Sequence, residues 1–138
     1  FKPLAYSLIL LRKDGFPCVF YGDYYGIPEH NISPKKEMID KMLELRKNYA
    51  WGEQIDYFDN HNIIAWVRKG DDIHPMSGLI VIMSDGPGGG KTINVGTKLA
   101  NSVFYDYTGN VQETVYVDQE GNGIFYCNGG SVSVWVRK

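Results

Sequence analysis

Short apolar runs separated by turn residues fill the chain from about residue 54 to its end. Glycine beside Asp, Asn or Lys marks most of the turns, as at Asp85-Gly86 and Thr108-Gly109-Asn110. Short apolar runs at this spacing are typical of antiparallel sandwiches and Greek-key barrels. We expect strands over residues 62–68, 78–83, 92–95, 103–105, 114–117, 123–127 and 131–136.

The first 52 residues follow a different period. Apolar residues recur at helical spacing over residues 1–9, which predicts a first helix. A second helix is expected after Ser33, a candidate N-cap, with Pro34 at the first helical position. Between the two helices, residues 17–21 form an apolar run that predicts a strand buried on both faces.

Such a strand needs strands beside it and helices on both faces of its sheet. We therefore interpret residues 1–52 as the helix-strand-helix end of a larger α/β domain, cut before Phe1, and residues 53–138 as a separate all-β domain. The expected fold class is mainly β. A dimer in which two chains cover each other's apolar surface is a second way to bury the strand.

Composition excludes several classes of function. The formal net charge of −2 excludes a strongly basic nucleic-acid binder, and the longest apolar stretch, residues 4–11, is too short to span a membrane. Aromatic residues make up 14% of the chain, enough to supply a packed core. Cys18 and Cys127 show no metal-ligand spacing; we predict two reduced, buried thiols, with one disulfide as the alternative.

Two glycine-rich segments resemble ligand-binding loops without meeting their requirements. Residues 85–92 end in Gly-Lys-Thr like a phosphate-binding loop, but Asp85 stands where that loop needs glycine and a strand pattern follows. A glycine-rich turn between strands is predicted instead. Residues 118–123 resemble the start of a calcium-binding EF-hand loop, yet its twelfth position is Gly129, so we predict a hairpin turn.

Acidic and histidine residues give no complete catalytic set. His30, His61 and His74 lack ligand spacing to one another. Nothing in the pattern makes Asp56 face Asp59, or Asp71 face Asp72, across a substrate at the ~5–9 Å that glycosidases need. We therefore identify no catalytic residue in this chain.

Ordered motifs across nearly the whole chain resemble one family. Leu4-Ala-Tyr-Ser-Leu-Ile-Leu-Leu-Arg12 and Gly15-Phe-Pro-Cys-Val-Phe-Tyr-Gly22 are similar to the seventh helix and eighth strand of the catalytic (β/α)8 barrel in bacterial, liquefying α-amylases. The resemblance continues through residues 45–52, 63–71 and 84–91, and ends with Gly129-Gly-Ser-Val-Ser-Val-Trp-Val136. It implies a barrel fragment over residues 1–52 and the family's all-β C-terminal domain over residues 53–138.

The same resemblance implies what the chain does. The parent would be a retaining enzyme that cleaves α-1,4-glucans such as starch or glycogen, and its nucleophile, acid/base and orienting carboxylates would lie upstream of Phe1. The chain itself would be a non-catalytic domain whose partner is the upstream barrel. Asp23 stands just past the expected strand and is a candidate substrate contact, with a structural turn acid as the alternative. The rival hypothesis is a free-standing carbohydrate-binding or interaction module.

A calcium ion is the one cofactor that the resemblance implies. In some liquefying α-amylases calcium bridges the barrel and the C-terminal domain, and the matching positions here are His61, Asn62 and Asp85. Asn62 stands where the family has Asp, which removes a negative charge from the ligand set. Because calcium prefers six to eight oxygen ligands, we expect at best roughly millimolar binding. The alternative is that Asn62 and Asp85 simply order adjacent turns.

Overall fold

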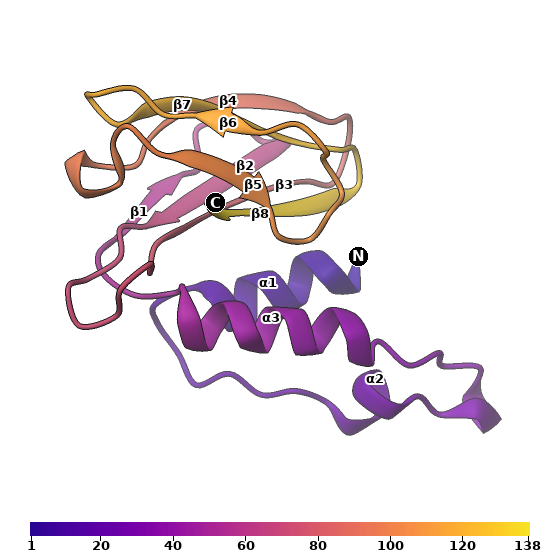
Figure 1. The fold of residues 1–138 in the computed structure, drawn as a ribbon. Helices are drawn as coiled ribbons and strands as arrows, with labels where there is room; N and C mark the ends of the chain where they lie inside the picture. The colour runs from indigo at the N-terminus through magenta and orange to yellow at the C-terminus, as the bar shows by residue number, and fades with distance from the viewer.

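The computed structural model describes residues 1–138 as three packed layers. Two helices, α1 (Lys2–Leu11) and α3 (Lys36–Asn48), lie side by side under the larger of two sheets (Figure 1). The short helix α2 (Tyr21–Tyr25) and the turn η1 (Pro28–His30) project from this helical layer. No helix has the length and hydropathy needed to cross a membrane.

Both sheets are antiparallel, which confirms the predicted mainly β fold. The larger sheet has the order β1-β2-β3-β8-β5-β6, and β4 pairs with β7 in the second. Because β8 returns between β3 and β5, the chain crosses between layers in the manner of a Greek key. The strands are β1 (Gln54–Tyr57), β2 (Ile63–Arg68), β3 (Leu79–Ser84), β4 (Gly89–Asn94), β5 (Val103–Asp106), β6 (Val115–Tyr116), β7 (Asn122–Cys127) and β8 (Ser131–Arg137); η2 (Thr97–Leu99) precedes β5.

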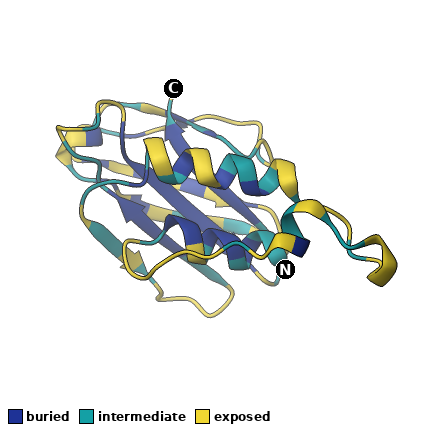
Figure 2. Cartoon of the chain, turned by 90° about the horizontal axis from the view of Figure 1, so that it is seen from below, coloured by how far each residue is buried: buried dark blue, intermediate teal, exposed yellow.

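The central strand β3 separates two hydrophobic cores. All six of its residues are buried, as Figure 2 shows in dark blue at the middle of the molecule. Alternate side chains of a strand point to opposite faces. Leu79 and Val81 therefore pack with the helices, while Ile80 and Ile82 pack with the second sheet. The helical layer thus shares a core directly with the β domain.

Helix α3 forms as predicted but begins later. Its apolar face, Ile39, Met42 and Leu45, is fully buried. Ser33 does not cap it, and the helix begins at Lys36 with Lys35 as N-cap. The backbone N–H of Lys35 donates to the carbonyl oxygen of Asp23 at 2.7 Å, which holds this segment against α2 and delays the first helical turn.

The strand predicted over residues 17–21 is absent from the structure. Residues 16–20 belong to no helix or strand and have no ladder partners, and Tyr21 already belongs to α2. Phe16 is fully exposed and Phe20 is 56% exposed. The reason is that a strand needs a neighbouring edge for its backbone groups, and no strand of this chain pairs with this segment.

The two cysteines are free, and only one of them is buried. Cys127 ends β7 and lies in the core shared by the two sheets, and burial raises the pKa of its thiol. Cys18 is exposed, contrary to the prediction, because it lies among residues 16–20, which pair with no strand.

The glycine-rich segment after β3 also differs from its prediction. It begins as a turn, but Gly89, Gly90 and Lys91 already pair with β7 as the first half of β4. Pairing with a complete partner strand outweighs the low strand propensity of glycine. The turn at residues 118–121 joins β6 to β7, which lie in different sheets, so it is not the hairpin expected there.

Candidate functional site

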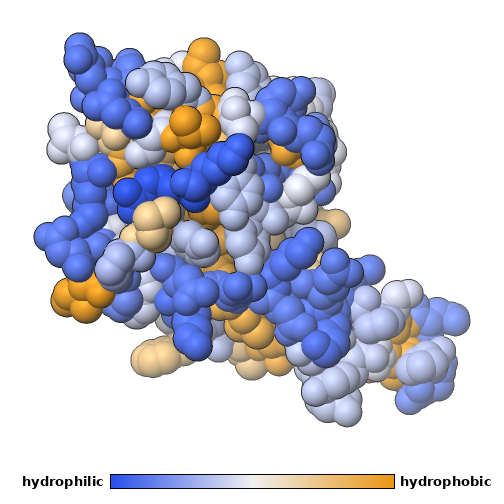
Figure 3. Space-filling view, in the orientation of Figure 1, coloured by the Kyte–Doolittle hydropathy of each residue, from blue (hydrophilic) through white to orange (hydrophobic).

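Exposed apolar side chains gather on the segment that links α1 to α3. We call residues 16–20, which belong to no helix or strand and lead into α2, the unpaired segment. Figure 3 shows apolar atoms interrupting the hydrophilic surface along its lower edge, where this part of the chain runs in Figure 1. The most exposed of these side chains are Phe16 at 102%, Tyr21 at 72%, Tyr25 at 57% and Phe20 at 56%. A contiguous exposed apolar surface is typical of an interaction site.

Asp23 connects α2, which follows the unpaired segment, to α1. Its carboxylate accepts a hydrogen bond from Tyr6 Oη at 2.6 Å and forms an ion pair with Lys2. Tyr6 Oη in turn accepts a hydrogen bond from the backbone N–H of Phe20 at 3.3 Å. The side chain of Asp23 is only 15% exposed. Both of its oxygens therefore have partners within the chain. This is the geometry of a carboxylate that holds two helices together.

The contacts between Lys2, Tyr6 and Asp23 shift the pKa values of Asp23 and Tyr6 in opposite directions. The hydrogen bonds from Lys2 and then Tyr6 hold the pKa of Asp23 below its ordinary value. Burial, and then the bond to Asp23, raises the pKa of Tyr6. Asp23 is recognisable in the sequence by its place after the apolar run, whereas Lys2 and Tyr6 lie 21 and 17 residues away and carry no motif of their own.

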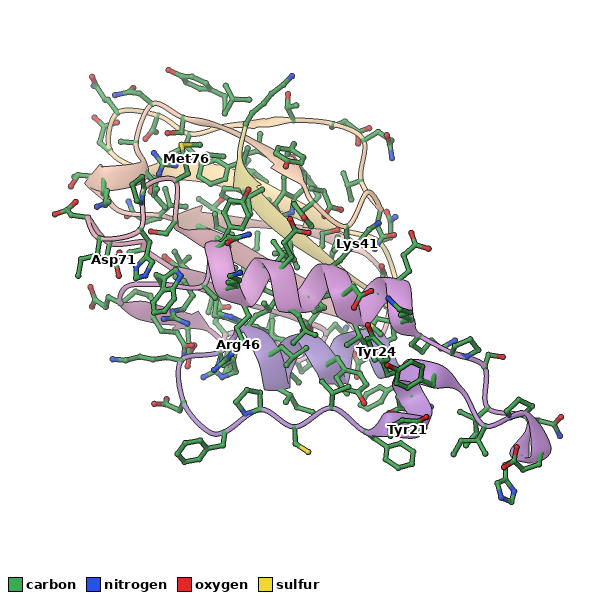
Figure 4. All side chains as sticks on the ribbon, turned by 60° about the horizontal axis from the view of Figure 1, so that its bottom comes forward. Tyr21, Tyr24, Lys41, Arg46, Asp71 and Met76 are labelled. Carbon is green, nitrogen blue, oxygen red and sulfur yellow. The ribbon has the colours of Figure 1, made fainter.

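A second contact fixes α2 against α3. Tyr24 Oη donates to Asp40 Oδ1 at 2.6 Å, and Lys36 Nζ contacts Asp40 Oδ2 at the same distance. These two donors, Lys36 first, lower the pKa of Asp40. Figure 4 shows Tyr24 beside α3 and Tyr21 on the outer side of α2. The short helix is thus anchored on one side and leaves its other tyrosines exposed.

The three predicted calcium positions lie at one corner of the molecule. His61, Asn62 and Asp85 line a cavity of about 150 Å³ beside the first turn of α1. The two turns that carry them are ordered by other residues: Asn60 Oδ1 accepts from the backbone N–H of Asn62 at 2.8 Å, and Ser84 Oγ accepts from that of Gly86 at 3.1 Å. The proposed turn-ordering role of Asn62 and Asp85 therefore falls to Asn60 and Ser84.

The donor set at this corner does not fit a calcium ion by itself. Asp85 is the one carboxylate among the residues that line the cavity, and most of the others are apolar, including Phe1, Leu4 and Ile64. Calcium requires six to eight oxygens, several of them charged. No group of three or more His, Cys, Asp or Glu side chains in the chain is arranged to hold a metal ion.

The four aspartates considered as possible catalytic pairs contact basic side chains rather than each other. Arg12 binds Asp56 through two hydrogen bonds of 3.0 and 2.9 Å, and Lys91 pairs with Asp59. His74 Nδ1 lies 2.8 Å from Asp71 Oδ1, and Lys98 pairs with Asp72. Three of these pairs join segments that are distant in the chain, and the contact of His74 with Asp71 orders a single loop, so these carboxylates have structural roles.

Comparison with known proteins identifies the relatives of this chain. Residues 79–136 match the family model described as alpha-amylase C-terminal. The whole chain is 55% identical to the glucan 1,4-alpha-maltohexaosidase of Bacillus sp. (strain 707) and 55% identical to the alpha-amylase of Geobacillus stearothermophilus. It spans 27% and 25% of the length of these two curated relatives.

A solved structure agrees with the fold. The crystal structure of an Anoxybacillus alpha-amylase superposes on 99% of this chain with a TM-score of 0.67 at 15% identity, and the chain covers 31% of that protein. The match spans both the helical layer and the sheets. These findings together show that the chain belongs to the bacterial α-amylase family and carries its C-terminal β domain.

Proposed function

We propose that this chain is the non-catalytic C-terminal part of an α-amylase that hydrolyses α-1,4-glucosidic bonds in starch or glycogen. Residues 1–52 would complete the catalytic (β/α)8 barrel, and residues 53–138 would form the β domain that packs on it. The sequence identity to bacterial relatives over the full chain supports this assignment. The glucan would reach this chain only through the parent enzyme.

The unpaired segment is the observation that carries the proposal. The backbone of residues 14–19 makes no hydrogen bond to another part of the chain, while Phe16 and Phe20 are exposed. Unpaired backbone groups beside apolar side chains form a template for strand addition. In a barrel sheet this segment would gain partners on both edges and bury its apolar residues on both faces.

The helical layer explains how the β domain would hold the barrel. Helices α1 and α3 share a hydrophobic core with β3 and β8, in which Leu10, Leu11 and Leu45 are at most 1% exposed. Burying apolar surface is the main stabilising contribution in such contacts. A barrel that contains these helices would therefore be fastened to the sheet through them, and Asp23 would serve as a positioning acid at the junction.

Reconstitution in trans tests the proposal. The remaining three quarters of the Geobacillus stearothermophilus relative, expressed without its matching portion, is mixed with this chain and assayed for reducing sugar released from soluble starch. We expect no activity from either piece and activity from the mixture. Phe20→Ser should weaken reconstitution, whereas Ile124→Ser, at a side chain of similar exposure on the opposite sheet, should not.

Two results would contradict the proposal. Starch hydrolysis by the pure chain, abolished by a mutation within it, would place a catalytic site here. Saturable binding of maltodextrin by the chain alone, without reconstitution, would favour the free-standing carbohydrate-binding module instead.

We also propose that the corner of His61, Asn62 and Asp85 is part of a weak calcium site completed by the rest of the enzyme. The side chains of Asn62 and Asp85 make no hydrogen bond within the chain and remain free to act as ligands, which supports this role. The departure at Asn62 leaves the site short of negative charge.

A further inference from the structure

A cavity lined by positively charged side chains lies at the end of the helical layer opposite α2. It has a volume of about 330 Å³ and is formed where α1 and α3 end against β2. Five cationic residues line it: Arg12, Lys13, Arg46, Lys47 and Arg68. We call it the cationic cavity. It is separate from the unpaired segment and from the calcium corner.

Arg68 is the unusual member of this group. It projects from β2, is only 6% exposed, and has no carboxylate within ion-pair distance. Its one hydrogen bond within the chain runs from Nε to the carbonyl oxygen of Gly52 at 3.1 Å. The two terminal nitrogens of the guanidinium are without partners. These nitrogens are not among the buried unpaired atoms of the chain, so they are accessible from the cavity, where an anion can reach them.

The charge of the cavity is not neutralised by its surroundings. The bidentate contact with Asp56 compensates Arg12, but Lys13, Arg46, Lys47 and Arg68 take part in no ion pair. The C-termini of α1 and α3 together contribute roughly one negative unit. Asp14 and Asp71 act on Arg68 at longer range. An excess of positive charge therefore remains.

Helix capping explains only some of the cationic residues at this cavity. Arg46 Nη1 donates to the carbonyl oxygen of Leu10 at 2.6 Å, which satisfies one group at the end of α1, and Figure 4 shows Arg46 beside the two helices. Arg68 comes from a strand and caps no helix. Burial, and then the neighbouring Arg46, lowers the pKa of Arg68, which indicates how poorly its charge is compensated.

We propose that the cationic cavity binds a phosphate group, either as inorganic phosphate or as the ester of a sugar phosphate. Guanidinium groups present paired N–H donors that match two oxygens of a phosphate. A dianion would compensate two of the unpaired cations, which chloride could not do. Trp51, which also lines the cavity, offers an aromatic surface for the sugar of a phosphate ester.

Calorimetric titration of the full chain with sodium phosphate tests this proposal. Sodium chloride at the same ionic strength is the control for general screening. We expect saturable binding of one phosphate per chain and a phosphate-dependent rise in melting temperature that chloride does not produce. A second titration with glucose 6-phosphate distinguishes the sources: tighter binding than inorganic phosphate assigns the site to a sugar ester, and equal or weaker binding assigns it to free phosphate.

Matched variants locate the site. Arg68→Gln retains a donor for Gly52 and should weaken phosphate binding about tenfold, as the loss of a charge-assisted hydrogen bond predicts. Lys69→Gln, the neighbouring position, whose side chain pairs with Glu53 at 3.4 Å, should leave the affinity unchanged. If Arg68→Gln does not fold, the double variant of the exposed lysines, Lys13→Gln with Lys47→Gln, takes its place and should weaken binding several-fold.

Two outcomes would overturn the proposal. Phosphate that stabilises the chain no more than chloride does would show general screening only. Equal weakening by Arg68→Gln and Lys69→Gln, or wild-type affinity in the double lysine variant, would show that the cavity is not where phosphate binds.

Discussion

The indole ring of Trp51 stacks flat on the imidazole of His74, with ring centroids 3.7 Å apart and planes inclined by 5°. Trp51 follows α3, and His74 lies in the loop between β2 and β3. The ring of His74 also contacts Asp71 Oδ1 at 2.8 Å, and its backbone N–H donates to the same oxygen. This stack therefore joins the helical layer to a long loop of the β domain.

Removing the stack should destabilise the chain. His74→Ala deletes an aromatic contact and the side-chain contact with Asp71, so we expect the free energy of unfolding to fall by about 1–2 kcal/mol. Urea denaturation followed by tryptophan fluorescence measures it. Ile73→Ala, at a neighbouring side chain that is 83% exposed, should change stability little. Equal losses in the two variants would mean that the stack contributes nothing specific.

Gly52 should not tolerate a side chain. Its φ is +85°, and a Cβ atom there would lie 2.2 Å from the carbonyl oxygen of Gly70. We expect Gly52→Ala to lower the free energy of unfolding by more than about 2 kcal/mol, because the clash adds to the backbone strain. Gly109→Ala is the matched control: its φ is +77° with open space around it, so it reports backbone strain alone. If Gly109→Ala lost as much unfolding free energy as Gly52→Ala, a clash at Gly52 would not be the cause.

The ionised carboxylate of Asp23 should stabilise the fold at neutral pH and lose this effect in strong acid. Its folded pKa lies below the ordinary value of 3.8, so its contribution is present above pH 3.8 and is lost as the pH falls through the folded pKa. Asp23→Asn should therefore lower the free energy of unfolding at pH 7 by about 1–2 kcal/mol, and the difference from the unmutated chain should shrink below pH 3.8. Denaturation curves across pH measure this. A difference that stays constant with pH, or one shared by Glu113→Gln, would exclude the ion pair as its cause.

Restoring a carboxylate at the calcium corner should strengthen calcium binding. The unmutated chain is expected to bind calcium with at best roughly millimolar affinity, because Asp85 is the one carboxylate at this cavity. Asn62→Asp adds a second negative charge and should lower the dissociation constant measured by calorimetry. Asn60→Asp is the control because it adds the same charge. The Oδ1 atom of Asn60 already accepts a hydrogen bond within the turn. Micromolar affinity in the unmutated chain would contradict this prediction.

Hydrogen exchange should separate the ladder strands from the unpaired segment. We expect the slowest amides in residues 63–68 and 132–136, because β2 and β8 are hydrogen-bonded within the larger sheet. Residues 18–21 should exchange quickly, since the segment has no ladder partner. Mass spectrometry of peptides from the deuterated chain measures both. Uniformly slow exchange in a monomer would refute the expected difference.

The sequence by itself determined the classes of element and most of their order. Short apolar runs bounded by turn residues predicted all of the strands from β2 to β8, because a buried strand needs apolar residues and must end at a turn. It missed β1, whose residues Gln54-Ile-Asp-Tyr57 carry little apolar pattern and become a strand by pairing with β2. It also predicted two helices through their apolar faces, one of which, Ile39, Met42 and Leu45, is fully buried in the structure.

Tertiary structure alone decided the rest. The run at residues 17–21 has the composition of a buried strand, yet residues 17–20 form no regular element and Tyr21 begins α2, because a strand exists only with a partner edge. Lys2 and Tyr6 meet Asp23, and Arg46 meets Arg68, because chain crossings bring distant residues together without any local motif. The spacing of apolar residues indicates whether a segment forms a helix or a strand. A site depends on which of these elements come into contact, and the spacing does not specify that.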